Sequence, residues 1–333
     1  MLLSNQQLTN NDSTVETSTN TALQFFLPVM TAMNIPMSLT NFFVILNIGF
    51  LNSPSIMIYF NLVIVDLLNS AVGVMISVDL WNNTDHQSAT FWGKRGHDMA
   101  FSYVYIFTFN MNIVLVLGLC LIRVLWTELS ALQVLTQLKV VSWVTIALAN
   151  FYGVFCCLLW YHESQKKSFK PHLLIPSHAV EVNDILDCAI ILSALYMSIY
   201  TQARIWLNKS RVNISIFRAA SRSSLIITLN VAVSYSFFVA MVATRIYYKV
   251  PWENKFTCPK DGVWSFTNLL LCDELYLTIT FMCFQSTMNS FILLFQRQTS
   301  RFLRVRGRMC VLDMKRKCSE CCTCGDDSDY DYL

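Results

Sequence analysis

Seven long apolar stretches, separated by short polar segments, follow one another along this chain between about residues 22 and 296. A membrane-spanning helix needs about 20 mostly apolar residues, because backbone groups in hydrocarbon must pair within their own segment. Four stretches exceed this length without one charged residue: 99–122, 140–161, 223–244 and 275–296. The pattern predicts an all-α fold, an integral membrane bundle of seven transmembrane helices.

The remaining three spans are less uniform. The first lies within residues 23–51, and the second covers about 55–79. The fifth, about 184–207, is charge-free only from 188 to 203, so Asp187 must enter the membrane or sit at its face. Asp66, in the second span, is the one carboxylate near the middle of a stretch.

Composition agrees with a membrane protein. Hydrophobic residues make up 54% of the chain, charged residues only 14%, and the mean hydropathy is +0.45, whereas ordinary soluble proteins carry about 25% charged residues. We therefore expect the lipid bilayer, and no nucleic acid, as a partner. The chain divides into a polar extracellular head (1–21), the seven-helix domain (22–296), and a cytoplasmic part (297–333) with a short amphipathic eighth helix and a Cys-rich acidic tail.

Basic residues indicate the orientation, because they gather in the loops that stay on the cytoplasmic side. With the N-terminus outside, 15 of the 24 Lys and Arg residues fall in inner segments, and the head has none. The sequons at Asn11 and Asn82 would then be extracellular glycosylation acceptors. The head also lacks the pattern of a secretory signal peptide, so we expect the first helix to act as the insertion signal.

Three motifs resemble those of the rhodopsin-like (class A) G-protein-coupled receptors. Residues 61–68, NLVIVDLL, are similar to that family's second-helix signature N-L-A-x-A-D-L, with Asp66 as its carboxylate. Arg123 stands where the family has D-R-Y, and Asn289 where it has N-P-x-x-Y, although the neighbouring family residues are replaced. The resemblance covers about residues 22–305, and the degraded motifs and short loops are most similar to an odorant-like or orphan chemosensory branch.

The resemblance implies a plasma-membrane receptor that binds an extracellular ligand between its helices and signals to a heterotrimeric G protein. By position, the pocket would be lined by Tyr105, Ile106, Phe109 and Asp187. Tyr105 occupies the place of the aspartate found in amine receptors, so the resemblance disfavours a biogenic amine and favours a small hydrophobic or weakly polar ligand.

Asp66 has two interpretations. In the family this carboxylate lines a sodium-binding pocket, and Asn112, Ser286 and Asn289 stand at the corresponding positions here. Ionisable residues inside a membrane are functional-site candidates because their burial is costly. The alternative is a neutral, protonated Asp66 that is hydrogen-bonded to those amides and hydroxyls.

Arg123 would be restrained by the neighbouring acid in the family's inactive state and would contact the G protein in the active state. Ile122 removes that acid, and the region 218–222 is basic, so no carboxylate is offered from there either. We therefore expect a weakly latched receptor with elevated basal signalling. The alternative is that Arg123 is simply a positive-inside anchor.

Cysteine usage departs from the family, which ties its third helix to the second outer loop by a disulfide. His97 and Asp98 stand where that cysteine is expected. The extracellular-looking pair is Cys258 and Cys272, and an oxidising exterior favours a bridge between them, with two free thiols as the alternative.

The tail cysteines follow a basic stretch that resembles a helix lying along the membrane. The residues concerned are Cys318, Cys321, Cys322 and Cys324. Their position next to the membrane favours palmitoylation, and a zinc site is the alternative.

No catalytic motif appears, whether a P-loop, H-E-x-x-H or G-x-S-x-G, so we expect no enzyme activity and no cofactor apart from a sodium ion near Asp66. The alternative function is a seven-helix transporter, channel or accessory membrane protein without G-protein coupling. Transporters usually show internal repeats and several mid-membrane polar groups, and the sequence shows no evident repeat and a single central carboxylate.

Overall fold

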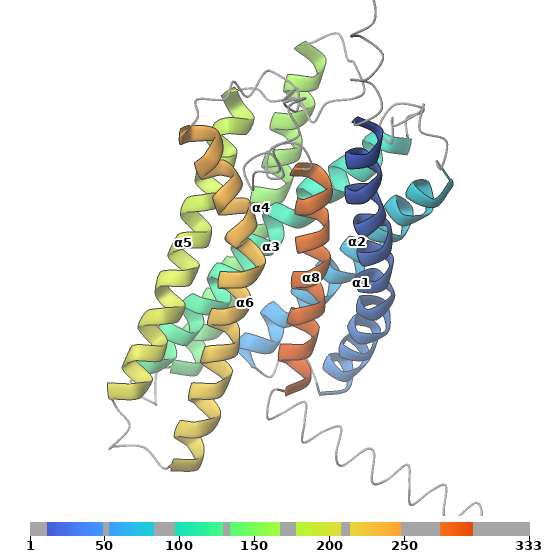
Figure 1. Ribbon diagram of the computed structural model, residues 1–333. Helices are drawn as coiled ribbons and strands as arrows, with labels where there is room; N and C mark the ends of the chain where they lie inside the picture. The colour runs from blue at the N-terminus through green and yellow to red at the C-terminus, as the bar shows by residue number, and fades with distance from the viewer. Residues whose placement is uncertain are drawn as a thin grey trace, which may run out of the picture.

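The described part of the chain is entirely helical (Figure 1). The computed structural model describes the residues of seven α-helices together with Ser53. The helices are α1 (Asp12–Ile48), α2 (Pro54–Asn82), α3 (His97–Glu128), α4 (Val134–Lys166), α5 (His178–Leu207), α6 (Ile214–Tyr247) and α8 (Glu274–Phe295).

Six of these helices are long and apolar enough to cross a membrane. Their candidate spans are Phe26–Asn47, Pro54–Met75, Tyr103–Glu128, Thr136–His162, Val182–Leu207 and Ser221–Tyr247. The predicted seventh span corresponds to α8, a helix of 22 residues. The expected amphipathic eighth helix falls in 297–333, outside the described residues. The part of the chain that the structure describes is thus all-helical, with the features of a multi-pass membrane protein.

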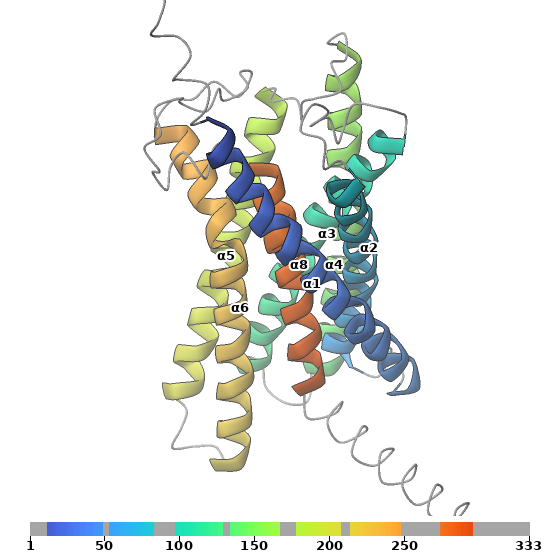
Figure 2. The same cartoon turned by 45° about the vertical axis from the view of Figure 1, so that its right-hand side comes forward.

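Helix α3 crosses the interior of the bundle at a tilt and packs on α2, α4 and α5 (Figures 1 and 2). Around it, α1 packs on α2 and α8, α6 packs on α8, and α5 packs on α6. Successive helices alternate in direction, so α3, α5 and α8 all finish at the same end of the bundle, the lower one in Figure 1. This end, which contains Arg123, is called the arginine end below.

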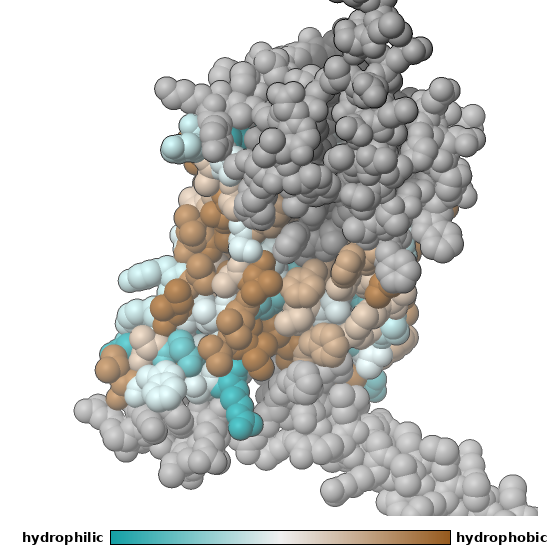
Figure 3. Space-filling model, viewed as in Figure 1, coloured by the Kyte–Doolittle hydropathy of each residue, from teal (hydrophilic) through white to brown (hydrophobic). Residues whose placement is uncertain are grey.

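The lateral surface of the bundle is apolar, as expected for a wall that faces lipid. Phe151 on α4 is 69% exposed and Tyr196 on α5 is 70% exposed, and many neighbouring aliphatic side chains are also exposed. Figure 3 shows hydrophobic residues over much of the described surface, with hydrophilic residues toward the lower end. A soluble protein rarely exposes so large a contiguous apolar surface.

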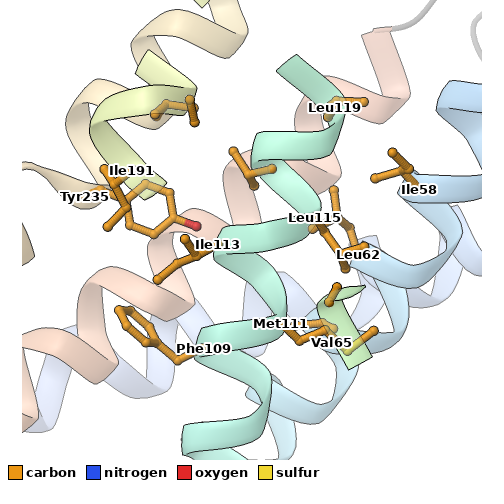
Figure 4. Packing of buried hydrophobic residues seen from close by; sticks show 14 of the residues in the cluster. Ile58, Leu62, Val65, Phe109, Met111, Ile113, Leu115, Leu119, Ile191 and Tyr235 are labelled. Carbon is orange, nitrogen blue, oxygen red and sulfur yellow. The ribbon is translucent and has the colours of Figure 1, made fainter. Parts of the chain in front are cut away.

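The apolar core gathers around α3 (Figure 4). Leu115 of α3 lies toward Leu62 of α2 on one side, and Ile113 lies toward Tyr235 of α6 on the other. Helices α3 and α4 approach closely because Gly118 lacks a side chain, and a Cβ there would lie 2.0 Å from Cγ2 of Thr145. Small residues allow this kind of close helix contact in membranes.

Two details extend the sequence analysis. Asp187, expected either inside the membrane or at its face, lies within the candidate span of α5 and is 1% exposed. Helix α1 begins at Asp12, within the expected polar head, and continues through Pro28 and Pro36.

Candidate functional site

The inward face of α8 is polar. It carries Gln285, Ser286, Asn289 and Ser290, all of them buried. Residues separated by one, four and five positions share one side of an α-helix, so these four side chains form one strip. Because a polar group inside a membrane is costly without a partner, the partners of this strip define the candidate site.

Toward α1, the strip is hydrogen-bonded through Ser290. Ser38 shares a hydrogen bond with the Ser290 hydroxyl (Oγ–Oγ 3.1 Å), and the Asn41 amide donates to the Ser290 carbonyl at 3.0 Å. Ser38 also donates to Oδ1 of Asn34 at 3.0 Å, and Asn34 donates to the Ser70 hydroxyl of α2 at 2.6 Å. These contacts tie α1, α2 and α8 together at mid-bundle.

The Asp66 carboxyl is completely buried beside this network. Ser286 and Asn289 approach it, but neither carboxyl oxygen accepts a hydrogen bond of standard geometry within the described part of the chain. Asn69 donates to the Ser286 hydroxyl at 3.3 Å, while its own Oδ1 and the Nδ2 of Asn289 are also without a hydrogen-bond partner there. Both carboxyl oxygens of Asp66, Oδ1 of Asn69 and Nδ2 of Asn289 are thus orphaned polar atoms, without a hydrogen-bond partner among the described residues.

Orphaned oxygens of this kind suit a small hard cation. A buried acceptor without a partner costs about 1–3 kcal/mol, and carboxylate, amide and hydroxyl oxygens are the ligands that hard cations prefer. Asp66, Asn69 and Ser286 are thus the residues present that fit such an ion.

Asn112, expected near Asp66, is hydrogen-bonded to a different residue of the strip. Its Nδ2 donates to Oε1 of Gln285 at 3.3 Å, and Nε2 of Gln285 lies 3.5 Å from Oδ1 of Asn112. The same Nε2 donates a short hydrogen bond to the Tyr235 hydroxyl of α6. These three residues join α6, α8 and α3.

A second contact joins α6 and α8 nearer the arginine end. Nδ2 of Asn230 donates to Oδ1 of Asn289 at 2.9 Å, and Ser234 donates to Oδ1 of Asn230 at 2.9 Å. Asn289 therefore links α6 to the surroundings of Asp66.

Arg123, near the end of α3, donates to the Ser223 hydroxyl of α6 at 2.8 Å. The acid that follows it on α3, Glu128, is bound to α5: Arg204 donates to both of its oxygens, at 2.6 and 2.8 Å, and the Tyr200 hydroxyl donates at 2.9 Å. Arg123 is thus held by a neutral hydroxyl, while the nearby carboxylate is occupied by another arginine.

Asp187 belongs to a separate polar cluster between α3, α4 and α5. Tyr152 donates to its Oδ1 at 2.7 Å, and Asn183 donates to its Oδ2 at 3.1 Å. Asn183 also lies 3.4 Å from Oδ1 of Asn110 and accepts from the Cys156 thiol at 3.0 Å. The donors that the carboxyl meets among the described residues are therefore neutral.

The other predicted pocket residues, Tyr105, Ile106 and Phe109, lie on α3 within five residues of Asn110. The rings of Tyr105 and Phe109 stack at 6.0 Å, and the Phe109 ring lies 5.0 Å from that of Phe238 on α6. Ile106 is partly buried, and its carbonyl accepts from Asn110 at 2.8 Å. Phe109 therefore faces α6, whereas the next residue on α3, Asn110, lies toward α5, where Asn183 connects it to Asp187.

Several predicted sites lie outside the described residues. They are the Cys258–Cys272 bridge, the Asn11 sequon, and the tail cysteines Cys318, Cys321, Cys322 and Cys324. Asn82 is the last residue of α2.

Sequence reasoning missed most of the buried amides and hydroxyls. They include Asn34, Ser38, Asn41, Asn69, Ser70, Asn230, Gln285 and Ser290. Their signal in the sequence is weak: several recur at helical spacing, but neutral amides and hydroxyls leave a run apolar enough to span a membrane.

No family model matches the chain, and no curated protein matches it either.

Proposed function

We propose that the chain is a plasma-membrane G-protein-coupled receptor of rhodopsin-like type, with its N-terminus outside. The observation that supports this most is the hydrogen bond between Arg123 and Ser223, which joins α3 to α6 at the arginine end. The bundle interior leading to that end is held largely by neutral hydrogen bonds. Such bonds cost little to exchange, so the bundle suits a protein that shifts between two conformations.

The proposed ligand is a small, hydrophobic or weakly polar molecule from outside. It would bind near Tyr105, Ile106, Phe109 and Asp187, in the half of the bundle away from Arg123. The aromatic contact between Phe109 and Phe238 and the hydrogen-bonded Asp187 cluster offer such a molecule apolar surface and a polar end group. A chemosensory role in the odorant-like branch is part of the same proposal.

A sodium ion near Asp66 is the proposed inorganic partner. Asp66, Asn69 and Ser286 would hold it, and the ion would supply the positive charge that the buried carboxylate lacks. Asn289 would complete the surroundings of the site, whereas Asn112 bonds Gln285 instead and would not hold the ion.

The proposed covalent features complete this description. Glycans on Asn11 and Asn82 and a Cys258–Cys272 bridge belong to the extracellular side. Palmitoyl groups on the tail cysteines would hold the cytoplasmic eighth helix at the membrane.

The test of the receptor proposal is nucleotide exchange on purified heterotrimeric G proteins of each class by the reconstituted chain. We expect exchange above the protein-free rate, and its loss in Arg123→Ala. The matched control is Arg222→Ala, which removes an exposed arginine at the same end of the bundle. A well-folded protein that stimulates no G-protein class, with or without a screened ligand library, contradicts the proposal.

The alternative is a transporter or channel. The continuous set of buried polar groups on α1, α2, α3, α6 and α8 favours it, because transport pathways need several polar groups at mid-membrane. Ion or solute flux in proteoliposomes that is lost in Asp66→Asn, without any G-protein response, would select this function instead.

A further inference from the structure

Three charged side chains are buried among those that the structure describes: Asp66, Asp187 and Arg245. Asp66 lies beside the polar strip of α8, and Asp187 belongs to the cluster with Tyr152. Arg245, in the last turn of α6, belongs to neither and is only 8% exposed. It lies inside the candidate membrane span of α6. A buried cation there is costly and is therefore a candidate for function.

The last turn of α6 buries its arginine and exposes its apolar residues. Ile246 and Tyr247, which follow Arg245, are both exposed. A long basic side chain near the end of a membrane helix usually extends to the surface, because its stem is flexible and its charge prefers water. Arg245 is enclosed by protein instead, so its charge is placed among the helices.

Arg245 continues the inward face of α6. Phe238, Met241 and Val242 are buried and precede it by seven, four and three residues, spacings that share one side of a helix. The Phe238 ring lies 5.0 Å from that of Phe109 on α3. Seven residues of α-helix rise about 10 Å. Arg245 therefore stands about 10 Å from the aromatic contact along α6, toward the end of the bundle opposite the arginine end.

A carboxylate of α5 acts on the same arginine. Asp184, three residues before Asp187, is partly buried and interacts electrostatically with Arg245. The two helices lie side by side at this end of the bundle (Figures 1 and 2). A guanidinium presents a planar fork of donors that matches carboxylates. Asp184 thus offers Arg245 the same kind of partner that an acidic ligand would offer, and the two would compete for it.

We propose that Arg245 binds the acidic end group of the ligand, and that the ligand is an apolar molecule with one carboxylate. Its apolar body would lie on the Phe109–Phe238 contact, and its carboxylate would lie at Arg245, about 10 Å away. Asp184 would hold the guanidinium while no ligand is bound. The inference rests on the proposed receptor function and narrows the proposed ligand to one whose polar group is acidic.

The test compares one apolar body with three end groups. Phenylalkanoates, phenylalkanols and phenylalkylamines of matched chain length are titrated into the purified chain in nanodiscs, with empty nanodiscs as the blank. We expect the phenylalkanoates to bind at least about tenfold more tightly than the phenylalkanols, because hydrogen bonds between charged partners are the stronger ones. The amines should bind no more tightly than the alcohols. Affinity should peak at the chain length that separates ring and carboxylate by about 10 Å.

Variants of α6 assign the preference to one side chain. Arg245→Gln should lower phenylalkanoate affinity by about tenfold or more and change phenylalkanol affinity little. Arg245→Lys should keep part of the preference, because lysine retains the charge and loses the fork. Arg222→Gln, the same change at an exposed arginine of α6, is the matched control and should leave the preference intact. Phe238→Leu should weaken all three classes alike, because it alters the contact with the apolar body.

Asp184→Asn separates ligand binding from a purely structural ion pair. Without the competing carboxylate, phenylalkanoates should bind severalfold more tightly, so the two partners give effects of opposite sign. A purely structural pair would lower the melting temperature in both Arg245→Gln and Asp184→Asn and leave the ratio of phenylalkanoate to phenylalkanol affinity unchanged; that result overturns the proposal. If Arg245→Gln does not fold, Arg245→Lys and Asp184→Asn still decide between the two.

The outcomes distinguish this inference from the receptor function. Carboxylate binding that depends on Arg245, without G-protein exchange in any variant, supports the ligand class and contradicts the receptor function. Arg123-dependent exchange together with equal affinities for the three end groups supports the receptor function and overturns the role of Arg245. Failure of the phenylalkanoates to bind at every chain length overturns the proposed ligand class as well.

Discussion

The guanidinium of Arg123 donates to the hydroxyl of Ser223 across the gap between α3 and α6, at 2.8 Å. A hydroxyl is a weaker partner for an arginine than a carboxylate is, because the bond lacks the attraction between opposite charges. The sequence predicts a weakly latched arginine without an acid beside it. The structure adds a hydroxyl that can serve as the neutral latch.

The first prediction concerns this latch. Ser223→Ala should raise basal G-protein exchange by about fivefold, since it removes one side-chain hydrogen bond from the resting state. The measurement is nucleotide exchange per folded receptor without ligand. Ser221→Ala is the control, because that hydroxyl bonds Gln202 of α5 instead. Equal basal rates in Ser223→Ala and the unsubstituted protein would show that the hydroxyl is no latch.

The second prediction concerns the cation. Sodium should raise the melting temperature of the purified protein relative to the same concentration of N-methylglucamine, because a ligand that binds only the folded state stabilises it. Asp66→Asn should abolish this difference, and Asn69→Ala should weaken it by removing one orphaned oxygen. Asn112→Ala is the discriminating control: its amide bonds Gln285, so the sodium effect should persist.

An absent sodium effect in the unsubstituted protein would contradict the ion and favour a protonated Asp66. An effect that survives Asp66→Asn would place the ion elsewhere.

The third prediction concerns the close contact between α3 and α4. Gly118→Val should destabilise the protein by about 1–3 kcal/mol, because the added side chain meets Thr145 in a packed interface. The measurement is thermal or denaturant unfolding in detergent. Leu148→Ala, at an exposed position on α4, should change stability far less. Comparable losses in both variants would argue against a tight α3–α4 contact.

The helices could be predicted from the sequence because the length of an apolar run and the absence of charge are local properties. Asp66 and Asp187 could also be picked out, since a carboxylate stands out within such a run. Asn230 and Gln285 could not, because neutral amides leave a stretch apolar enough to span a membrane. Their importance depends on partners that belong to other helices.

Asn112 illustrates the same limit more sharply. It lies on the interior side of α3, where it is buried. Its partner could not be read from α3, because Asp66 and Gln285 come from two different neighbouring helices. Only the three-dimensional arrangement places Asn112 against Gln285 and leaves the Asp66 oxygens without a hydrogen bond of standard geometry from any described residue.

The last prediction concerns the cluster around Asp187. Helices α4 and α5 each pack more extensively on α3 than on one another, so the 2.7 Å hydrogen bond from Tyr152 to Asp187 is a main link between them. Tyr152→Phe should lower the free energy of unfolding by about 1–3 kcal/mol, because it leaves a buried carboxyl oxygen short of a donor. Tyr196→Phe, on an exposed tyrosine of α5, is the matched control and should have little effect.

Asp187→Asn tests the same link from its other side. An amide still offers one oxygen to Tyr152, so this variant should lose less stability than Asp187→Ala. In a double-mutant cycle with unfolding as the readout, Tyr152→Phe should add little in the Asp187→Ala background, because the shared bond is already gone. Fully additive losses would show that the two side chains act independently and that α4 and α5 are held together by other contacts.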